Sequence, residues 1–277
     1  MADTVLAQAA LDRLHAVLET MPHRTVACSG GVDSLVLAAV SHRADPTRTV
    51  VVHGVSPAVP ADAAARVRSV AAEAGWDLML VETGELGDDR YVRNATDRCY
   101  HCKDRLYTAM ERLAPHVAAQ PPSTLVSGAN LDDLADDRPG LVAAERHGIR
   151  HPFIEALVGK EAIRAIAQAW NLPFANIPAS PCLASRLYTG TAVSVARLAA
   201  VDAGERALRD ATGITVARCR IRENLGLIEV GAEERDRVTH SVVEVVALAM
   251  RSADPRVVDV RLDDRPYRPG RAVIRVN

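Results

Sequence analysis

The sequence predicts an α/β fold in which a parallel sheet is covered by helices on both faces and is followed by a smaller α+β domain. In the first two-thirds of the 277 residues, short β-branched apolar runs alternate with longer segments of helical periodicity, which is the order of a parallel sheet with crossover helices. After a proline-containing segment the order changes, and neighbouring alternating runs indicate an antiparallel component. We therefore expect one domain over residues 1–180 and a second over residues 181–277.

The first domain is expected to open with a helix at Thr4–Thr20. Short apolar runs predict strands at Thr25–Cys28, Thr49–His53, Asp77–Glu82 and Ser123–Gly128. Helical periodicity is found near residues 32–43, 61–74 and 101–118 and again at Lys160–Trp170. Strands and helices thus alternate along this part of the chain.

The segment Asn171–Gly190 has a different character, because it contains three prolines among small and polar residues. We expect it to form an ordered loop at the domain boundary. The second domain is then predicted to contain helices near 192–211 and 234–251 and strands at Ile214–Ile221, Leu225–Val230, 256–262 and 271–276.

Composition excludes several classes of protein. The 33 basic and 35 acidic residues leave a net charge of −2, so no overall basic field attracts nucleic acid. Aromatic residues make up 3% of the chain, which disfavours base-stacking surfaces. The longest apolar runs, such as Leu35–Val40, are too short to cross a bilayer, and the first residues lack the basic and apolar segments of a secretion signal. We expect a cytoplasmic protein with a small-molecule substrate and neither a nucleic-acid nor a membrane partner; a homo-oligomer stays open.

A phosphate loop is predicted at residues 29–34, where the first strand runs through Ser29-Gly30-Gly31-Val32-Asp33-Ser34 into a helix. Adjacent glycines let the backbone approach an anion, and the N–H groups and dipole of the helix start attract it. The serine hydroxyls can donate hydrogen bonds, and the Asp33 carboxylate can hold a Mg²⁺ ion that bridges phosphate oxygens. A simple helix cap is the alternative, but the complete hexad in this context favours phosphate binding.

The chain has no Walker or dinucleotide glycine motif. Instead, the hexad SGGVDS resembles the PP-loop of the N-type ATP pyrophosphatases. That resemblance implies a Rossmann-like fold and cleavage of ATP between its α and β phosphates, which attaches AMP to an oxygen of the substrate. It identifies the activation step and leaves the nucleophile open.

The five cysteines fall into two groups. Cys28 ends an apolar strand and Cys219 lies in the alternating run Arg218–Ile221, so both are expected to be buried small residues. Cys99 and Cys102 form a C-x-x-C at the start of a helix, where basic neighbours and the helix N-terminus favour thiolates. Alone, this pair is also compatible with chance, with a reversible disulfide or with half of a zinc site.

A third thiol, Cys182, lies far along the chain in Ala179-Ser180-Pro181-Cys182. If the fold brings it near the pair, three thiolates can hold a [4Fe–4S] cluster with one iron open. Alternatively, His101 would complete a zinc tetrahedron, although its place between Cys99 and Cys102 makes ligation by all three awkward.

Four motifs together resemble the LarE family of ATP-dependent sulfur transferases, which make the thiocarboxylates of the nickel-pincer nucleotide. They are SGGVDS at 29–34, DRCYHCK at 97–103, GANLDDLADDRPG at 128–140 and ASPCLASR at 179–186. The resemblance implies ATP-dependent adenylation of a carboxylate of pyridinium biscarboxylic acid mononucleotide, followed by sulfur delivery. Cys182 matches the family's sulfur-carrying cysteine. Because Cys99 and Cys102 are also present, we favour a cluster that supplies sulfide over the sacrifice of the sulfur of Cys182.

The acidic loop, residues 128–140, contains Gly128, Asn130, Asp132, Asp133, Asp136 and Asp137. It follows the end of an expected strand, where open α/β sheets bind ligands. A solvated acidic turn is the usual alternative, but the family match favours a nucleotide or Mg²⁺ role for Asn130, Asp132 and Asp133. Asp137 departs from the family, which usually has an aromatic residue there.

Three arginines are candidates for binding the substrate phosphate, namely Arg186, Arg218 and Arg220. Arg218 and Arg220 are two residues apart on one strand, so they share a face, and guanidinium groups suit phosphate oxygens. The alternative is a solvent-facing strand, but the resemblance places them at the family's R-x-R. Leu187–Gly190 and Arg222–Asn224 depart from the family's usual residues, so the resemblance is weaker for substrate recognition than for ATP chemistry.

Other functions remain as competitors. A tRNA-thiolating enzyme shares the phosphate loop and the three cysteines, but it needs an RNA surface that the charge and aromatic content disfavour. An amidotransferase-type synthetase has no use for three thiols. A sensor that binds adenine nucleotide or an iron–sulfur cluster without turnover would leave ATP intact.

Overall fold

The computed structural model describes residues 2–117, 123–135 and 139–274. Backbone contacts divide the chain into two compact units. The first unit comprises Met1–Ser56, Ala61–Gly84 and Cys99–Ser180. The second comprises Pro57–Pro60, Glu85–Arg98 and Pro181–Asn277, so two short segments from the first hundred residues group with the C-terminal part.

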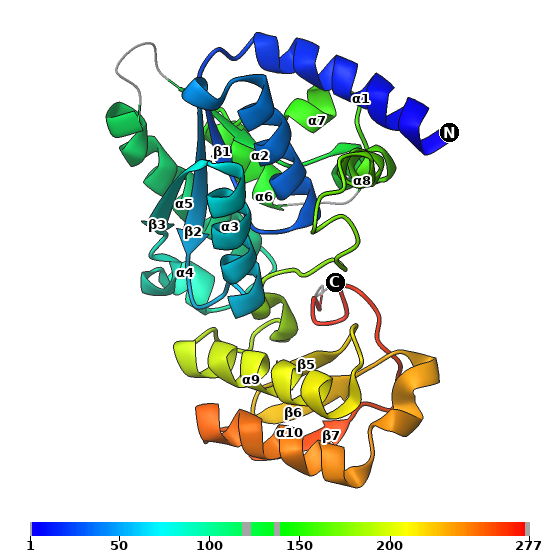
Figure 1. Cartoon of the computed structure of the whole chain (residues 1–277). Coiled ribbons are helices and arrows are strands. Elements are labelled where there is room, and N and C mark those ends of the chain that lie inside the picture. The colour runs from blue at the N-terminus through cyan, green and yellow to red at the C-terminus, as the bar shows by residue number, and fades with distance from the viewer. Residues whose placement is uncertain (1, 118–122, 136–138, 275–277) are drawn as a thin grey trace. The chain divides into compact units, whose positions relative to one another are not determined.

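The first unit is built on a sheet of four parallel strands in the order β3-β2-β1-β4 (Figure 1). The strands are β1 (Arg24–Ala27), β2 (Thr49–Val55), β3 (Asp77–Glu82) and β4 (Thr124–Ser127). The predicted α/β class is confirmed, and the four expected strands form within about two residues of their predicted bounds.

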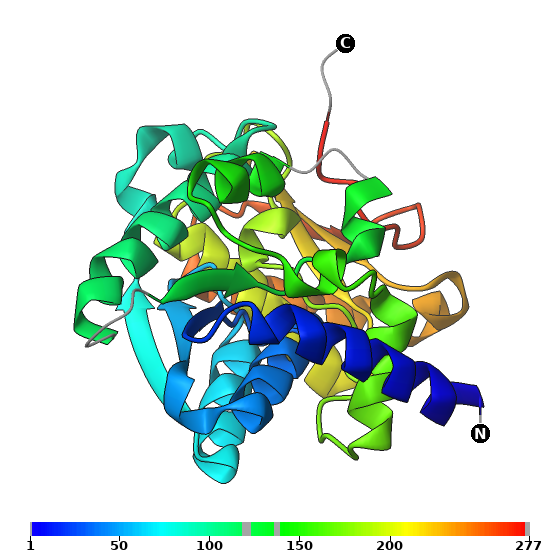
Figure 2. The same ribbon diagram turned by 90° about the horizontal axis from the view of Figure 1, so that it is seen from above.

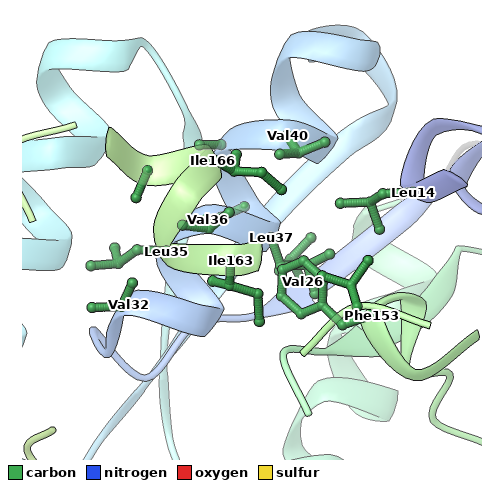
Figure 3. Packing of buried hydrophobic residues seen from close by; sticks show 14 of the residues in the cluster. Leu14, Val26, Val32, Leu35, Val36, Leu37, Val40, Phe153, Ile163 and Ile166 are labelled. Carbon is green, nitrogen blue, oxygen red and sulfur yellow. The ribbon is translucent and has the colours of Figure 1, made fainter. Parts of the chain in front are cut away.

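Helices cover both faces of this sheet because strand side chains alternate between two cores. Val26 and Val51 belong to one core with residues of α1 (Ala2–Glu19), α2 (Val32–Ala44), α3 (Ala61–Ala74), α7 (Pro152–Glu155) and α8 (Lys160–Ala169) (Figure 3). Their neighbours Ala27 and Val52 belong to the other core with residues of α5 (Arg98–Val117) and α6 (Pro139–Arg146). On the first face, α1, dark blue in Figure 2, packs along α8.

The second unit contains a small mixed sheet in the order β5-β6-β7. β5 (Arg218–Arg222) and β6 (Leu225–Glu229) are antiparallel, and β7 (Asp259–Leu262) joins β6 in parallel. Two long helices, α9 (Val195–Thr212) and α10 (His240–Ala253), pack on each other; α9 also contacts β5 and α10 contacts β7. A short helix, α4 (Asp89–Val92), belongs to the segment that joins this unit from the first hundred residues.

Two strand predictions in the second unit are wrong in part. β5 begins at Arg218 rather than at Ile214. Residues 271–274, the described part of the expected last strand, form no strand, because their backbone makes isolated hydrogen bonds instead of a ladder. The Thr189 N–H donates to the Ala272 carbonyl (2.9 Å), and the Ile274 N–H donates to the Thr189 hydroxyl (3.0 Å).

In the part of the chain that the structure describes, no helix is both long and apolar enough to cross a membrane.

Candidate functional site

The phosphate loop connects β1 to α2 and is ordered by its two serines. The Ser29 N–H donates to the Ser34 hydroxyl oxygen (3.1 Å), and that hydroxyl donates to the Gly31 carbonyl (3.0 Å). The two hydroxyl oxygens lie 3.2 Å apart. Because these bonds fold the loop over the first turn of α2, the N–H groups of the helix start face the loop, as phosphate binding needs.

Two glycines allow the close approaches that shape this loop. Gly30 has a φ of +82°, and a Cβ there would lie 2.7 Å from the Ala63 carbonyl oxygen on α3. A Cβ at Gly128, just after β4, would lie 2.9 Å from the backbone nitrogen of Ser34. From α3, Arg66 also donates to the Gly30 carbonyl (2.7 Å). Any side chain at either glycine would therefore displace backbone of the phosphate loop or its support.

Asn130 joins the acidic loop to the phosphate loop. Its side-chain amide donates to the carboxylate of Asp33 (3.1 Å), and its backbone N–H donates to the carboxylate of Asp133 (3.2 Å). Its own side-chain oxygen accepts from the N–H of Asp132 (3.1 Å). Asn130 is fully buried, so these bonds hold the carboxylates of Asp33 and Asp133 and the backbone of Asp132 around one residue.

The start of α8 anchors the same loop. The Asp132 carboxylate accepts the backbone N–H of Lys160 (2.8 Å), a typical anion position at a helix N-terminus. The Lys160 ammonium lies 3.3 Å from the carboxylate of Asp133, which is buried. The described part of the loop is therefore a docked element rather than a solvated turn. Asp136 and Asp137 lie outside the described residues.

The surroundings of Asp33 disfavour the ionised form of its carboxylate. Burial raises the pKa of Asp33, the neighbouring Asp133 and then Asp132 raise it further, and Lys160 and Arg164 oppose them. In the described residues, no three His, Cys, Asp or Glu side chains are grouped closely enough to bind a metal ion by themselves. A Mg²⁺ ion here would thus need phosphate oxygens and water as further ligands, which is how Mg²⁺ usually binds beside a nucleotide.

The C-x-x-C occupies the first turn of α5. Cys99 is exposed and Cys102 is half-buried. The first turn of α6, which continues from the acidic loop, approaches this turn closely: a Cβ at Gly140 would lie 3.2 Å from the Lys103 side chain and 3.9 Å from the Cys99 carbonyl oxygen. Within the first unit, the cysteine pair therefore lies beside the end of the acidic-loop motif.

The cysteine loop, residues 179–186, belongs mainly to the second unit, where arginines bind the carbonyl groups of its last residues. Arg186 donates to the carbonyls of Pro181 (2.5 Å) and Cys182 (3.2 Å). Arg98 donates to Ala184 (2.7 Å), and Arg220 donates to Ser185 (3.2 Å). The half-buried Cys182 thiol therefore stands on a backbone whose carbonyls are held at four positions.

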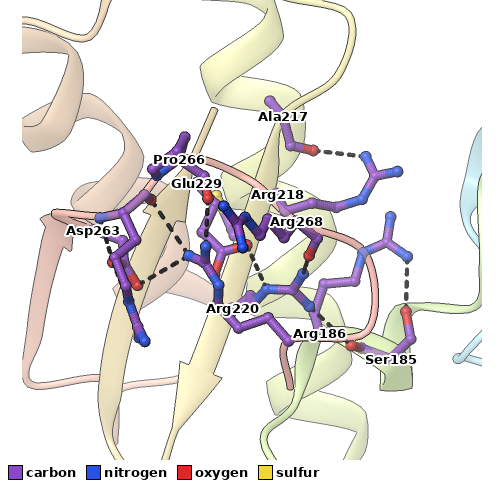
Figure 4. A network of polar contacts seen from close by, with 12 residues as sticks. Ser185, Arg186, Ala217, Arg218, Arg220, Glu229, Asp263, Pro266 and Arg268 are labelled. Carbon is purple, nitrogen blue, oxygen red and sulfur yellow. Dashed lines mark hydrogen bonds and ion pairs between the residues drawn. The ribbon is translucent and has the colours of Figure 1, made fainter. Parts of the chain in front are cut away.

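Arg186 and Arg220 are also paired with buried carboxylates. Arg186 binds Glu205 of α9 through two nitrogens at 2.8 and 3.0 Å, and Arg220 binds Glu229 of β6 at 2.7 Å (Figure 4). Although burial opposes it, the pair with Glu205 raises the pKa of Arg186. These two guanidinium groups therefore maintain the local structure, whatever else they bind.

Arg218 has a different environment in the same cluster. It donates to the Ala217 carbonyl (2.8 Å) and lies over the Tyr267 ring, 5.3 Å from its centroid. Burial, and then the positive charge of Arg186, lower the pKa of Arg218. The nearby Glu205 carboxylate opposes this lowering.

The chain resembles several known proteins over most of its length. No family model matches it. An uncharacterized protein of Synechocystis is 32% identical over 232 residues, which cover 84% of the chain and 85% of that protein. The pyridinium-3,5-bisthiocarboxylic acid mononucleotide synthase of Lactiplantibacillus plantarum is 30% identical over 218 residues, 78% of each chain. The chain belongs to the LarE-like family.

A further relative of this LarE-like protein, an uncharacterized protein of Methanocaldococcus jannaschii, is 28% identical over 222 residues, which cover 80% of the chain and 82% of that protein. Each match covers 78% or more of the chain, so the likeness is not confined to the phosphate loop.

The structure of this LarE-like protein brings some of the predicted site residues together. In the first unit, the phosphate loop, Asn130, Asp132 and Asp133 form one bonded group. In the second unit, Arg218 lies close enough to Arg186 and Arg220 to be repelled by them, and Arg218 and Arg220 both lie over the Tyr267 ring. The cysteines are divided, since Cys99 and Cys102 fall in the first unit and Cys182 in the second.

Sequence reasoning missed the residues that support these groups, namely Arg66, Asn94, Lys160, Glu205 and Glu229. Only Lys160 had a usable signal, because it opens an expected helix directly after Gly159. The other supporting residues bind partners that are distant in sequence.

Proposed function

We propose that this LarE-like protein is an ATP-dependent sulfur transferase. It adenylates a carboxylate of pyridinium biscarboxylic acid mononucleotide, converts it to a thiocarboxylate, and releases AMP and pyrophosphate. The observation that carries the proposal is the bond from Asn130 to Asp33, which unites the phosphate loop with the acidic loop, beside a helix start that bears the C-x-x-C. The likeness to the Lactiplantibacillus synthase supports sulfur transfer in cofactor synthesis.

The first step uses the phosphate loop. Ser29, Gly30, Gly31 and Ser34 bind the phosphates of ATP, while Gly128 keeps α2 close to β4. Asp33 would hold Mg²⁺, with Asn130, Asp132 and Asp133 around it. A substrate carboxylate oxygen attacks the α-phosphorus, the bond to the β-phosphate breaks, and pyrophosphate leaves. The N–H groups of the helix start stabilise the negative phosphate oxygens, and Mg²⁺, when bound, would supply further positive charge there.

The second step replaces AMP by sulfur. A sulfur nucleophile attacks the acyl carbon, the carbon–oxygen bond to AMP breaks, and AMP carries away the former carboxylate oxygen. Cys99, Cys102 and Cys182 are a suitable donor set for a [4Fe–4S] cluster, because all are cysteines and two stand at a helix N-terminus. Such a cluster, when bound, supplies an extra sulfide from its open iron.

In this proposal the three thiols act together as the sulfur source. The alternative sulfur source is Cys182 itself, which would lose its sulfur and become dehydroalanine.

The second unit supplies the substrate-binding residues in this proposal. Arg218 and Arg220 bind the substrate phosphate, with Arg186 at the base of the same cluster. Arg186 and Arg220 are also paired with carboxylates, so they support the cluster as well.

The test combines anaerobically purified protein, Mg·ATP and the biscarboxylate. We expect AMP, pyrophosphate and thiocarboxylate in equal amounts, and none of them with Asp33→Asn. Intact mass before and after turnover, with iron and sulfide analysis, distinguishes the sulfur sources. Loss of one H₂S from Cys182 in a colourless protein would exclude the cluster source, whereas ADP without thiolated product would exclude the function.

A further inference from the structure

Arg66, on the second turn of α3, binds the backbone of the phosphate loop within the first unit. Its guanidinium donates to the carbonyl of Gly30 at 2.7 Å. The Arg66 side chain is half-buried, whereas Arg68 on the same helix is exposed. Among the residues that the structure describes, no carboxylate forms an ion pair with Arg66. A positive charge without a carboxylate partner therefore lies against the phosphate loop.

The peptide group between Gly30 and Gly31 has its two polar groups on opposite sides. A trans peptide directs the carbonyl of one residue away from the N–H of the next, so the Gly31 N–H points away from the Arg66 guanidinium. This N–H lies 3.5 Å from the Ser29 hydroxyl oxygen, a long and weak hydrogen bond. It can therefore turn to a stronger acceptor, such as a phosphate oxygen at the start of α2.

The backbone at Gly30 explains why this peptide group needs an outside partner. Gly30 has a φ of +82° and Gly31 a φ of −80°, and glycine adopts either sign of φ with little penalty. Successive N–H groups in such a turn form a concave site for anions. By holding the Gly30 carbonyl, Arg66 fixes the direction of the Gly31 N–H before a ligand binds, which lowers the cost of binding.

We propose that Arg66 is a positioning residue of the phosphate loop, which holds the Gly30 carbonyl so that the Gly31 N–H faces the phosphates of ATP. This inference rests on the proposed function for its ligand, but phosphate binding can be measured without the second substrate and without turnover. A merely structural contact between α3 and the loop would stabilise the fold and would not distinguish phosphate from the nucleoside.

The test measures the affinity of the whole protein for three probes, Mg·ATP, magnesium pyrophosphate and adenosine, by equilibrium dialysis. Arg66→Met removes the donors and the charge but keeps an unbranched side chain. We expect the affinities for ATP and pyrophosphate to fall about ten-fold, the change expected from losing one charged hydrogen bond, and the affinity for adenosine to stay unchanged. Arg66→Lys should restore part of the loss, because its ammonium group keeps the charge and can donate to the same carbonyl.

Arg68→Met is the matched control, because it removes the same charge from an exposed position of the same helix. All three affinities of this variant should equal those of the unchanged protein. Arg66→Gln decides the matter if Arg66→Met does not fold, since it keeps a polar donor without the charge. It should weaken pyrophosphate binding less than ten-fold but measurably more than Arg68→Met does.

Unchanged pyrophosphate affinity in the folded Arg66 variants, or an equal loss of adenosine affinity, would overturn the proposal. If those variants bind pyrophosphate normally while the protein forms AMP and thiocarboxylate, the positioning role fails and the proposed function stands. Arg66-dependent binding of pyrophosphate in a protein that forms no AMP would support the positioning role and contradict the proposed function.

Discussion

The ion pair between Arg186 and Glu205 gives a prediction whose magnitude follows from burial. Their residues are 1% and 3% exposed, and two hydrogen bonds of 2.8 and 3.0 Å join them. Glu205→Ala leaves the guanidinium charge buried with only carbonyl and hydroxyl partners. Breaking a buried pair in this way costs about 3–5 kcal/mol. For a unit of roughly a hundred residues, this corresponds to a lower melting temperature by about 12 °C or more.

The two tryptophans allow this loss to be assigned to the second unit. Trp76 and Trp170 both lie in the first unit, so their fluorescence follows its unfolding, whereas circular dichroism follows the helices of both units. We expect Glu205→Ala to lower the melting temperature of the part of the dichroism transition that is not accompanied by a fluorescence change, which is the unfolding of the second unit. Alkylation of Cys182 should also become faster, because Arg186 holds the Pro181 and Cys182 carbonyls.

Two further variants make the prediction refutable. Glu244→Ala, which removes an exposed carboxylate of the same unit, should change stability by less than about 0.5 kcal/mol. The double variant Arg186→Met with Glu205→Leu should be more stable than Glu205→Ala, since no unpaired charge remains buried. A Glu205→Ala loss below about 1 kcal/mol, or a double variant no better than the single one, would refute the assignment of a stabilising buried pair.

Three other predictions concern the first unit and the thiols. Gly128→Ala should weaken ATP binding more than about ten-fold in calorimetry, because the added Cβ would lie 2.9 Å from the Ser34 nitrogen. The control Gly87→Ala has open space around it and should leave ATP binding unchanged; equal affinities of the two variants would contradict this prediction. Burial, then Asp133, raises the pKa of Asp33, so its ionised form costs stability above that pKa. Asp33→Asn should therefore raise the melting temperature of the ligand-free protein at neutral pH but not in acid, and it should abolish AMP formation. An increase in melting temperature that is independent of pH would count against this explanation. Burial raises the pKa of Cys28 to about 11 and that of Cys219 well above its usual value. Iodoacetamide at pH 8 should therefore label Cys99 and Cys182 in the native protein and should label Cys28 and Cys219 only after unfolding. Labelling of Cys28 in the native protein would show that the described packing of the loop is wrong.

The fold of the first unit could be predicted because each strand can be recognised from its own short stretch of sequence. β1 is a short β-branched run followed at once by glycines and a helix, and β2 and β3 are likewise short apolar runs. The last expected strand failed because alternation at 271–274 cannot reveal whether a neighbouring strand exists. No prediction covered α6 and α7, which are short and begin at prolines.

The candidate site could be predicted only as far as its motifs extend. The phosphate loop and the acidic loop are each one continuous stretch of sequence, so the sequence alone indicates their chemistry. By contrast, Arg98 and Ala184 are 86 residues apart, and Asn94 and Thr191 are 97 apart. No local pattern encodes such pairs, because each of these side chains binds a backbone carbonyl group, which every residue has.

The most direct test of the central claim follows the substrate oxygen. With the biscarboxylate labelled by ¹⁸O in its carboxylates and unlabelled water, one ¹⁸O should appear in AMP for each thiocarboxylate formed, because the carboxylate oxygen that attacks the α-phosphorus leaves with AMP. Mass spectrometry of AMP from a single turnover measures this. AMP without ¹⁸O, or ADP in its place, would show that the protein does not activate the carboxylate by adenylation.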